Sequence, residues 1–210
     1  LTLSWGTPHD PYQEMPAEHA EKYRWEDIEY LPNNSPYEPG EVKVAKRKML
    51  AGYYAHITAL DGQLGRLLQF LDETPDPRAP EKRLAETTIV VFGSDHGDML
   101  GSHGQYFKSQ PHKESTGVPL IVRWPGRVPA GRCSDGPISL VDLMPSLLSL
   151  SGVEIPPQAE GEDLAPFILG DERRAQDSVW INFPVDVKII HSPPFRGVVT
   201  RDHTYAVTRE

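Results

Sequence analysis

The sequence predicts an α/β protein in which a mostly parallel sheet is flanked by helices, followed by a small α+β subdomain with antiparallel strands. Helical periodicity at residues 44–72 precedes an apolar run at 87–95, and a second apolar run at 117–126 precedes a helical pattern at 139–150. Helices that alternate with buried strands in this order are typical of α/β domains. Both strand-like runs are continuously apolar, which indicates strands covered on both faces, as in parallel sheets.

Residues 1–43 predict a short strand followed by a long loop. Residues 1–5 alternate in a way that suits a strand, and the segment GTPHDPY that follows contains prolines and a glycine, which is typical of a loop, with His9 at its centre. Residues 13–43 are polar and interrupted by prolines. A loop of this length in a compact domain is usually functional or packs as a lid.

The two predicted helices differ in the strength of their pattern. In residues 44–72 the apolar side chains recur every three or four positions and so share one face of a helix. They are Leu50, Tyr53, Ile57, Leu60, Leu64, Leu67 and Leu71. Gly52, Gly62 and Gly65 lower the helix propensity without abolishing it. In residues 139–150, Pro145 either bends the helix or stands near its start.

The last part of the chain predicts the antiparallel subdomain. Short strand-like segments, DSVWINF, FRGVVTR and HTYAVTR, are separated by turns. We therefore expect one domain over residues 1–152 and the beginning of a smaller, incomplete one over residues 153–210.

Composition excludes some classes of protein. The net charge of −9 over 210 residues argues against nucleic-acid binding, which needs a basic face. A single cysteine, Cys133, excludes an internal disulfide framework. No stretch approaches the roughly 20 apolar residues that span a bilayer. The first residues include no initiating Met and no signal-peptide pattern, so we expect a piece of a longer protein, and the sequence leaves its compartment unknown.

Asp95 and His96 stand where the first predicted strand ends. In open α/β sheets, ligands bind beyond the carboxyl ends of the strands. A carboxylate beside an imidazole can occupy neighbouring positions on one divalent cation: oxygen-rich surroundings suit calcium or magnesium, and an imidazole also admits manganese or zinc. The alternative is that Asp95 caps the following turn and His96 bonds locally. The dipeptide alone leaves both interpretations open.

Residues 94–126, SDHGDMLGSHGQYFKSQPHKESTGVPLIVRWPG, resemble a segment of the sulfatase family in the alkaline-phosphatase superfamily. In that family a metal-binding Asp-His or Asp-Asn pair is followed by a Gly-His-Gly turn, a substrate-binding lysine and a strand ending in WPG. The matching lysine here is Lys108. The segments TPHDPY, AGYYAHITALDGQLGRLLQFLDE and ISLVDLMPSLLSLSGVEIP resemble further family segments, the first of which places His9 at a sulfate-contacting histidine.

The resemblance implies metal-dependent hydrolysis of a sulfate monoester within an alkaline-phosphatase-like fold. Asp95 and His96 would be metal ligands, with calcium the first expectation and magnesium or manganese the alternatives; His9 and Lys108 would bind sulfate and take part in catalysis. The family's nucleophile is a formylglycine made in a C-x-P-S/T-R motif. Cys133 lies in GRCSDG, which lacks that pattern. We therefore expect the nucleophile on an upstream part of the polypeptide, and no activity from this chain alone.

Two other functions remain open. Phosphonate or phosphate ester hydrolases of the same superfamily can have a nearly identical Asp-His pair and lysine spacing. A fragment that only binds or only supports the fold is the second alternative.

Overall fold

The computed structural model describes residues 1–15, 17–29, 31–34, 39–186 and 193–208. Parts of the predicted 13–43 loop and the end of the last predicted strand therefore lie outside the described residues. The chain divides into two compact units, residues 1–84 with 99–106, and residues 85–98 with 107–210. The expected boundary after residue 152 is a different division and stays a prediction.

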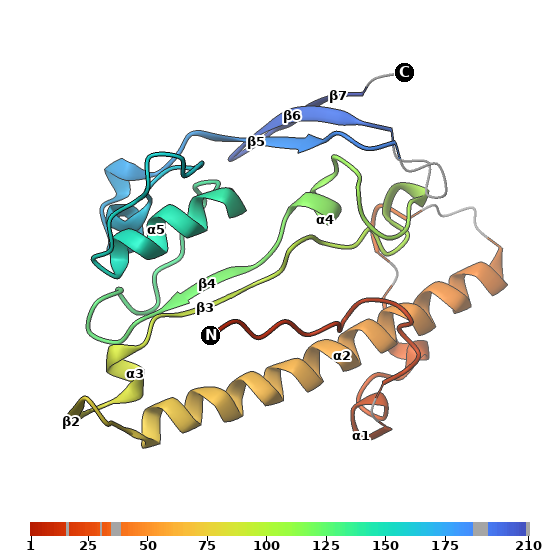
Figure 1. Ribbon diagram of the computed structural model, residues 1–210. Helices are drawn as coiled ribbons and strands as arrows, with labels where there is room; N and C mark the ends of the chain where they lie inside the picture. The colour runs from red at the N-terminus through yellow and green to blue at the C-terminus, as the bar shows by residue number, and fades with distance from the viewer. Residues whose placement is uncertain (16, 30, 35–38, 187–192, 209–210) are drawn as a thin grey trace. The chain divides into compact units, whose positions relative to one another are not determined.

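The first unit is built on one long helix (Figure 1). Its elements are α1 (Ala17–Ala20), the 3-10 helix η1 (Trp25–Asp27), α2 (Gly40–Glu73), the strands β1 (Pro75–Asp76) and β2 (Ala79–Arg83), and the 3-10 helix η2 (Ser102–Gly104). Helix α2 confirms the predicted helix at 44–72 and begins one turn earlier, after Pro39. Leu50, Ala51 and Ile28 form its buried core.

The N-terminal loop is seated against α2 at Gly52. A Cβ atom on Gly52 would lie 2.1 Å from the Tyr12 carbonyl oxygen. Tyr12 is buried, and its ring lies 6.0 Å from that of Tyr53. The glycine expected only to weaken the helix is therefore what lets the loop approach it. Residues 1–5, by contrast, form no strand, which corrects that expectation: they are exposed, and their backbone pairs with none of the described residues.

The second unit contains the predicted strands. Its elements are β3 (Val90–Gly93), α4 (Lys113–Thr116), β4 (Leu120–Arg123), η3 (Leu140–Asp142), α5 (Leu143–Leu150), α6 (Ala165–Ile168), η4 (Glu172–Arg174), β5 (Ser178–Phe183), β6 (Phe195–Thr200) and β7 (Thr204–Thr208). The short helix α3 (Leu84–Thr87) lies where the first unit ends and the second begins. Leu150, Ala165 and Ile168 form a buried cluster with partly buried side chains that include Val122 and Trp124.

The strands β3 and β4 pair antiparallel, with Val90 opposite Arg123 and Gly93 opposite Leu120. The expectation of a parallel arrangement is wrong for this pair. A parallel pair needs a crossover connection, usually a long helix, whereas residues 94–119 contain only η2 and the four-residue α4. Ile121 is 57% exposed, so within the described residues β4 is covered less completely than its apolar run predicted.

The other predicted elements of this unit are confirmed. The helix at 139–150 forms as η3 followed by α5, with Pro145 in the first turn of α5, where a backbone N–H has no helical partner to lose. The strands β5, β6 and β7 form an antiparallel sheet in the order β5-β6-β7 (Figure 1). Among the described residues, no helix has both the length and the hydropathy to cross a membrane.

Candidate active site

The loop after β3 is fixed by short hydrogen bonds among Ser94, Asp95 and His96. The Ser94 hydroxyl donates to the His96 carbonyl at 2.8 Å. The His96 backbone N–H donates to Asp95 Oδ1 at 3.0 Å. This is the turn capping expected as the simpler interpretation of Asp95, and it uses only one of the two carboxylate oxygens. Sequence reasoning misses Ser94, because a single serine after a strand signals no more than a turn.

The other carboxylate oxygen faces the histidine ring. Asp95 Oδ2 lies 3.6 Å from His96 Nε2. His96 Nδ1 lies 2.8 Å from the Gly97 carbonyl oxygen. Because a carbonyl can only accept, Nδ1 carries a proton, and Nε2 of the neutral ring then has a lone pair. Two acceptor atoms therefore face each other, an arrangement that a proton on Nε2 or a bound cation would satisfy.

The separation of these two atoms fits one cation. Two ligands at right angles, each about 2.3–2.6 Å from a calcium ion, stand about 3.3–3.7 Å apart. The observed 3.6 Å lies in that range. Asp95 is 85% exposed and His96 36% exposed at the side chain, so both atoms can be reached. The described part of the chain holds no cluster of three or more His, Cys, Asp or Glu side chains suited to a metal.

Gly97 holds this loop against α4. Its backbone N–H donates to the Ser115 carbonyl at 2.8 Å. A Cβ atom at this position would lie 2.1 Å from the Glu114 carbonyl oxygen and 3.2 Å from that of Gly117. A glycine is therefore required here, because another backbone segment approaches closely. This approach fixes the backbone next to His96.

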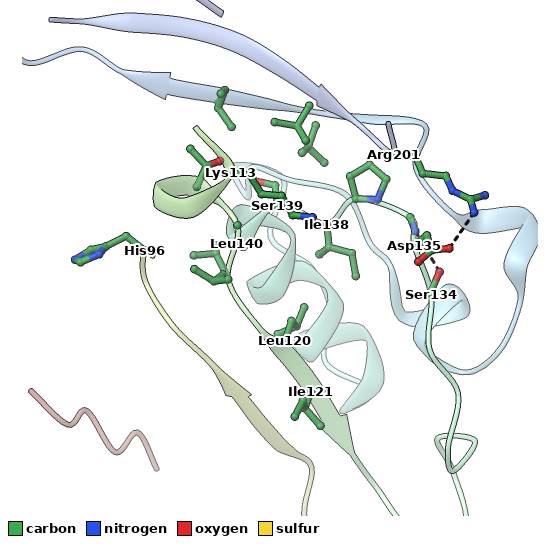
Figure 2. A pocket seen from close by; sticks show the side chains of 18 of the residues that line it. His96, Lys113, Leu120, Ile121, Ser134, Asp135, Ile138, Ser139, Leu140 and Arg201 are labelled. Carbon is green, nitrogen blue, oxygen red and sulfur yellow. Dashed lines mark hydrogen bonds and ion pairs between the residues drawn. The ribbon is translucent and has the colours of Figure 1, made fainter. Parts of the chain in front are cut away.

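Asp95, His96 and Lys108 line the same cavity, whose volume is about 1540 Å³. Lys108 is half-buried and stands between Phe107 and Ser109, both of which have positive φ. Figure 2 shows Lys113 and Arg201 at the same cavity, with Arg201 directed at Asp135, 3.0 Å away. The His96 ring points away from the labelled apolar side chains Ile138 and Leu140. The structure thus places three of the four predicted residues in the second unit, on the lining of one large cavity.

His9, the fourth predicted residue, belongs to the first unit. Its Nδ1 lies 2.9 Å from the Asp10 carbonyl oxygen and 2.9 Å from Asp10 Oδ1. Both partners are acceptors, so the proton again sits on Nδ1. The ring is exposed, and the peptide bonds Thr7–Pro8 and Asp10–Pro11 on either side are cis.

Comparison with known proteins gives the family of this chain. The family model described as Sulfatase matches residues 1–153. An ulvan-active sulfatase from Formosa agariphila is 35% identical over 99% of this chain and 39% of its own length. The chain belongs to the sulfatase family.

Solved structures share the fold. The protein yidJ from Bacteroides fragilis, named as a presumed sulfatase, superposes with a TM-score of 0.79 at 29% identity, over 97% of this chain and 43% of that one. A phosphonate monoester hydrolase of Agrobacterium radiobacter has a TM-score of 0.61 at 23% identity, over 79% of this chain and 36% of that one, which shows the fold alone. These likenesses confirm the predicted alkaline-phosphatase-like α/β class. The chain spans about two fifths of the length of the sulfatase relatives. Sulfatases generally use a divalent metal ion.

Proposed function

We propose that the full-length polypeptide carrying this chain is a sulfuric ester hydrolase that cleaves a sulfate monoester. The observation that supports it best is the pair of acceptor atoms, Asp95 Oδ2 and His96 Nε2, at a separation suited to one cation. In this proposal Asp95 and His96 hold the metal ion, and His9 and Lys108 bind sulfate and assist its hydrolysis.

Each residue has a distinct task. The cation, when bound, supplies Lewis acidity toward the ester and stabilises negative charge. The Gly97 carbonyl keeps the Nδ1 proton of His96 in place, so that Nε2 stays available as a ligand. Lys108 sets its ammonium group against a sulfate oxygen, where a fixed charge in a partly dry site acts more strongly than in water.

His9 is suited to proton transfer or hydrogen bonding. Its Nδ1 is bonded to Asp10. In the doubly protonated ring Nε2 carries a proton as well, which it can donate to a sulfate oxygen or pass to the departing alkoxide. No segment of the 210 residues matches C-x-P-S/T-R. The nucleophile is therefore assigned to another part of the polypeptide, and this chain alone is expected not to turn over sulfate esters.

Calcium is the metal that we propose. One site oxygen comes from a carboxylate, and further oxygens from outside this chain would complete the six to eight ligands that calcium takes. Magnesium or manganese are the alternatives, since an imidazole suits manganese as well.

The substrate class is tested with the full-length polypeptide on a panel of esters. An aryl sulfate, a phosphate monoester and a phosphonate monoester are compared by kcat/KM, with ulvan added because the Formosa relative is named for it. We expect the sulfate ester to be preferred by about tenfold or more. A preference for either phosphorus ester would instead favour the phosphonate or phosphate hydrolase function, and no turnover of any ester would favour a non-catalytic role.

A further inference from the structure

The turn Met99–Tyr106 has an unusual backbone. Leu100 and His103 have positive φ values of 46° and 54°, and Gly101 and Gly104 have values of 90° and 72°. L-residues rarely adopt this region and are held there only when their surroundings determine it. Four backbone hydrogen bonds close the turn, all at 2.7–3.1 Å. The N–H groups of Ser102, Gly104, Gln105 and Gly101 donate to the carbonyl oxygens of Met99, Gly101, Ser102 and Gln105, respectively.

A buried lysine of α2 contacts this turn. Lys46 is only 3% exposed, which is rare for a lysine unless its charge is partnered. Its Nζ donates to Asn34 Oδ1 at 2.9 Å and, at the longer distance of 3.5 Å, to the Gly101 carbonyl oxygen. Nζ also lies 5.3 Å from the centre of the Tyr106 ring, within the range of a cation–π contact. One ammonium group therefore links α2 to the 31–34 loop, to Gly101 within the turn and to Tyr106 at the end of the turn.

The packing at Gly101 shows how closely these groups meet. A Cβ atom on Gly101 would lie 2.7 Å from Asn34 Oδ1 and 2.9 Å from both Cε and Nζ of Lys46. Beside this contact, the His103 backbone N–H donates to the Asn33 carbonyl at 3.2 Å. The turn is thus held at two successive residues of the 31–34 loop, Asn33 and Asn34. The contact at Asn34 is the buried one, and it is made through Lys46.

The ends of the turn lead directly to the candidate site residues. Along the chain His96 precedes Met99 by three positions, and Lys108 follows Tyr106 by two. We propose that Lys46 is a positioning residue: by holding the Gly101 carbonyl, Asn34 and the Tyr106 ring, it fixes the turn and, through the chain, the residues on either side that bind metal and sulfate. What those residues bind rests on the proposed function, but the contacts that Lys46 makes with the turn do not depend on it.

The test uses the full-length polypeptide with Lys46→Met, which shortens the side chain by one heavy atom and removes its charge and donors. Amide hydrogen exchange is measured across residues 94–110, and calcium affinity is measured by calorimetry below the unfolding temperature of every variant. We expect exchange in the turn and at Gly97 to accelerate by about tenfold or more, and calcium to bind about 10–100-fold more weakly, as when a partner of a metal ligand is lost.

Two further lysine variants separate positioning from general stability. Lys46→Arg keeps a charged donor and is expected to recover part of the protection and of the calcium affinity. Lys48→Met makes the same change two positions along α2, at an exposed lysine that lies 5.5 Å from the Trp25 ring. It is expected to leave exchange across 94–110 and calcium binding as in the wild type.

Two glycine variants in the turn test the same contacts of Lys46. Gly101→Ala places a methyl group against Asn34 and Lys46, whereas Gly104→Ala meets nothing within 4 Å at a similar positive φ. We expect Gly101→Ala to reproduce the Lys46→Met result and Gly104→Ala to produce a clearly smaller effect. This pair decides the matter if Lys46→Met does not fold.

The outcomes distinguish this inference from the proposed function. Unchanged exchange in Lys46→Met, or faster exchange in the turn with wild-type calcium affinity, would overturn the positioning role. If the wild-type protein binds no calcium and hydrolyses no ester, the proposed function fails. In that case exchange at Gly97 and at residues 107–110 still decides whether Lys46 fixes the chain on both sides of the turn.

Discussion

Replacing His96 by Ala in the full-length polypeptide is expected to lower kcat/KM for a sulfate ester by about 10²-fold or more, because a proposed ligand of the metal ion would be lost. The Nδ1 contact with the Gly97 carbonyl leaves Nε2 as the ring nitrogen that would hold the cation in this proposal. His96→Gln, which offers an amide group in place of Nε2, should recover little of the activity. Steady-state kinetics at saturating calcium measure the effect.

Lys108→Ala is expected to cause a loss of similar size, since it removes a charge that would stabilise the transition state. The controls are His203→Ala and Lys82→Ala, which truncate exposed side chains of the β6–β7 turn and of β2. They should retain wild-type kcat/KM. Near-normal turnover in His96→Ala or Lys108→Ala would remove that residue from the site.

A second large effect, on the free energy of unfolding, is expected when Asp142 is replaced by Ala. This carboxylate is 3% exposed. Its Oδ1 accepts from the Glu162 N–H at 2.8 Å, and its Oδ2 accepts from the Ser139 N–H at 2.9 Å and from Gln176 Nε2 at 3.2 Å. Asp142→Ala leaves these three part-buried donors without their buried acceptor, and an unpaired group costs up to about 1–3 kcal/mol, the more the deeper it is buried. We expect the free energy of unfolding to fall by about 3 kcal/mol or more.

Urea unfolding of the full-length protein measures this loss, with Asp142→Asn expected to lie between the wild type and Asp142→Ala. The control is Asp135→Asn, which breaks an exposed ion pair with Arg201 and should cost about 1 kcal/mol or less. Equal effects of Asp142→Ala and Asp135→Asn would show that the buried hydrogen bonds do not stabilise this unit.

The sequence predicted the elements whose pattern is local. The apolar positions of α2 repeat at helical spacing, and β5 to β7 are short segments between turns, so both could be found without knowing their neighbours. The pairing direction of β3 and β4 could not, because an apolar run shows how buried a strand is and not which way its partner runs. Gly52 was interpreted as a weakness of the helix, since nothing local shows that Tyr12 approaches it.

The candidate site, too, was predicted only where a local pattern marks its residues. Asp95 and His96 follow a strand end, and Lys108 was found by its resemblance to a family segment. The proton position on His96 depends on the Gly97 carbonyl and needed coordinates. Lys46 stands among other basic residues of α2 and carries no mark of its own, since its burial comes from the distant Asn34 and Gly101. Asp142 had a local signal, the Ser-x-x-Asp spacing of a capping box that begins at Ser139.

Asp95 and His96 are proposed to hold a divalent cation. The most direct test is a calorimetric titration of calcium into the full-length protein, its Asp95→Asn variant and an Asp202→Asn control, which changes an exposed acid lining the same cavity. We expect the wild type and the control to bind calcium, and Asp95→Asn to bind it at least about tenfold more weakly. Equal calcium affinity in all three proteins would contradict this proposal.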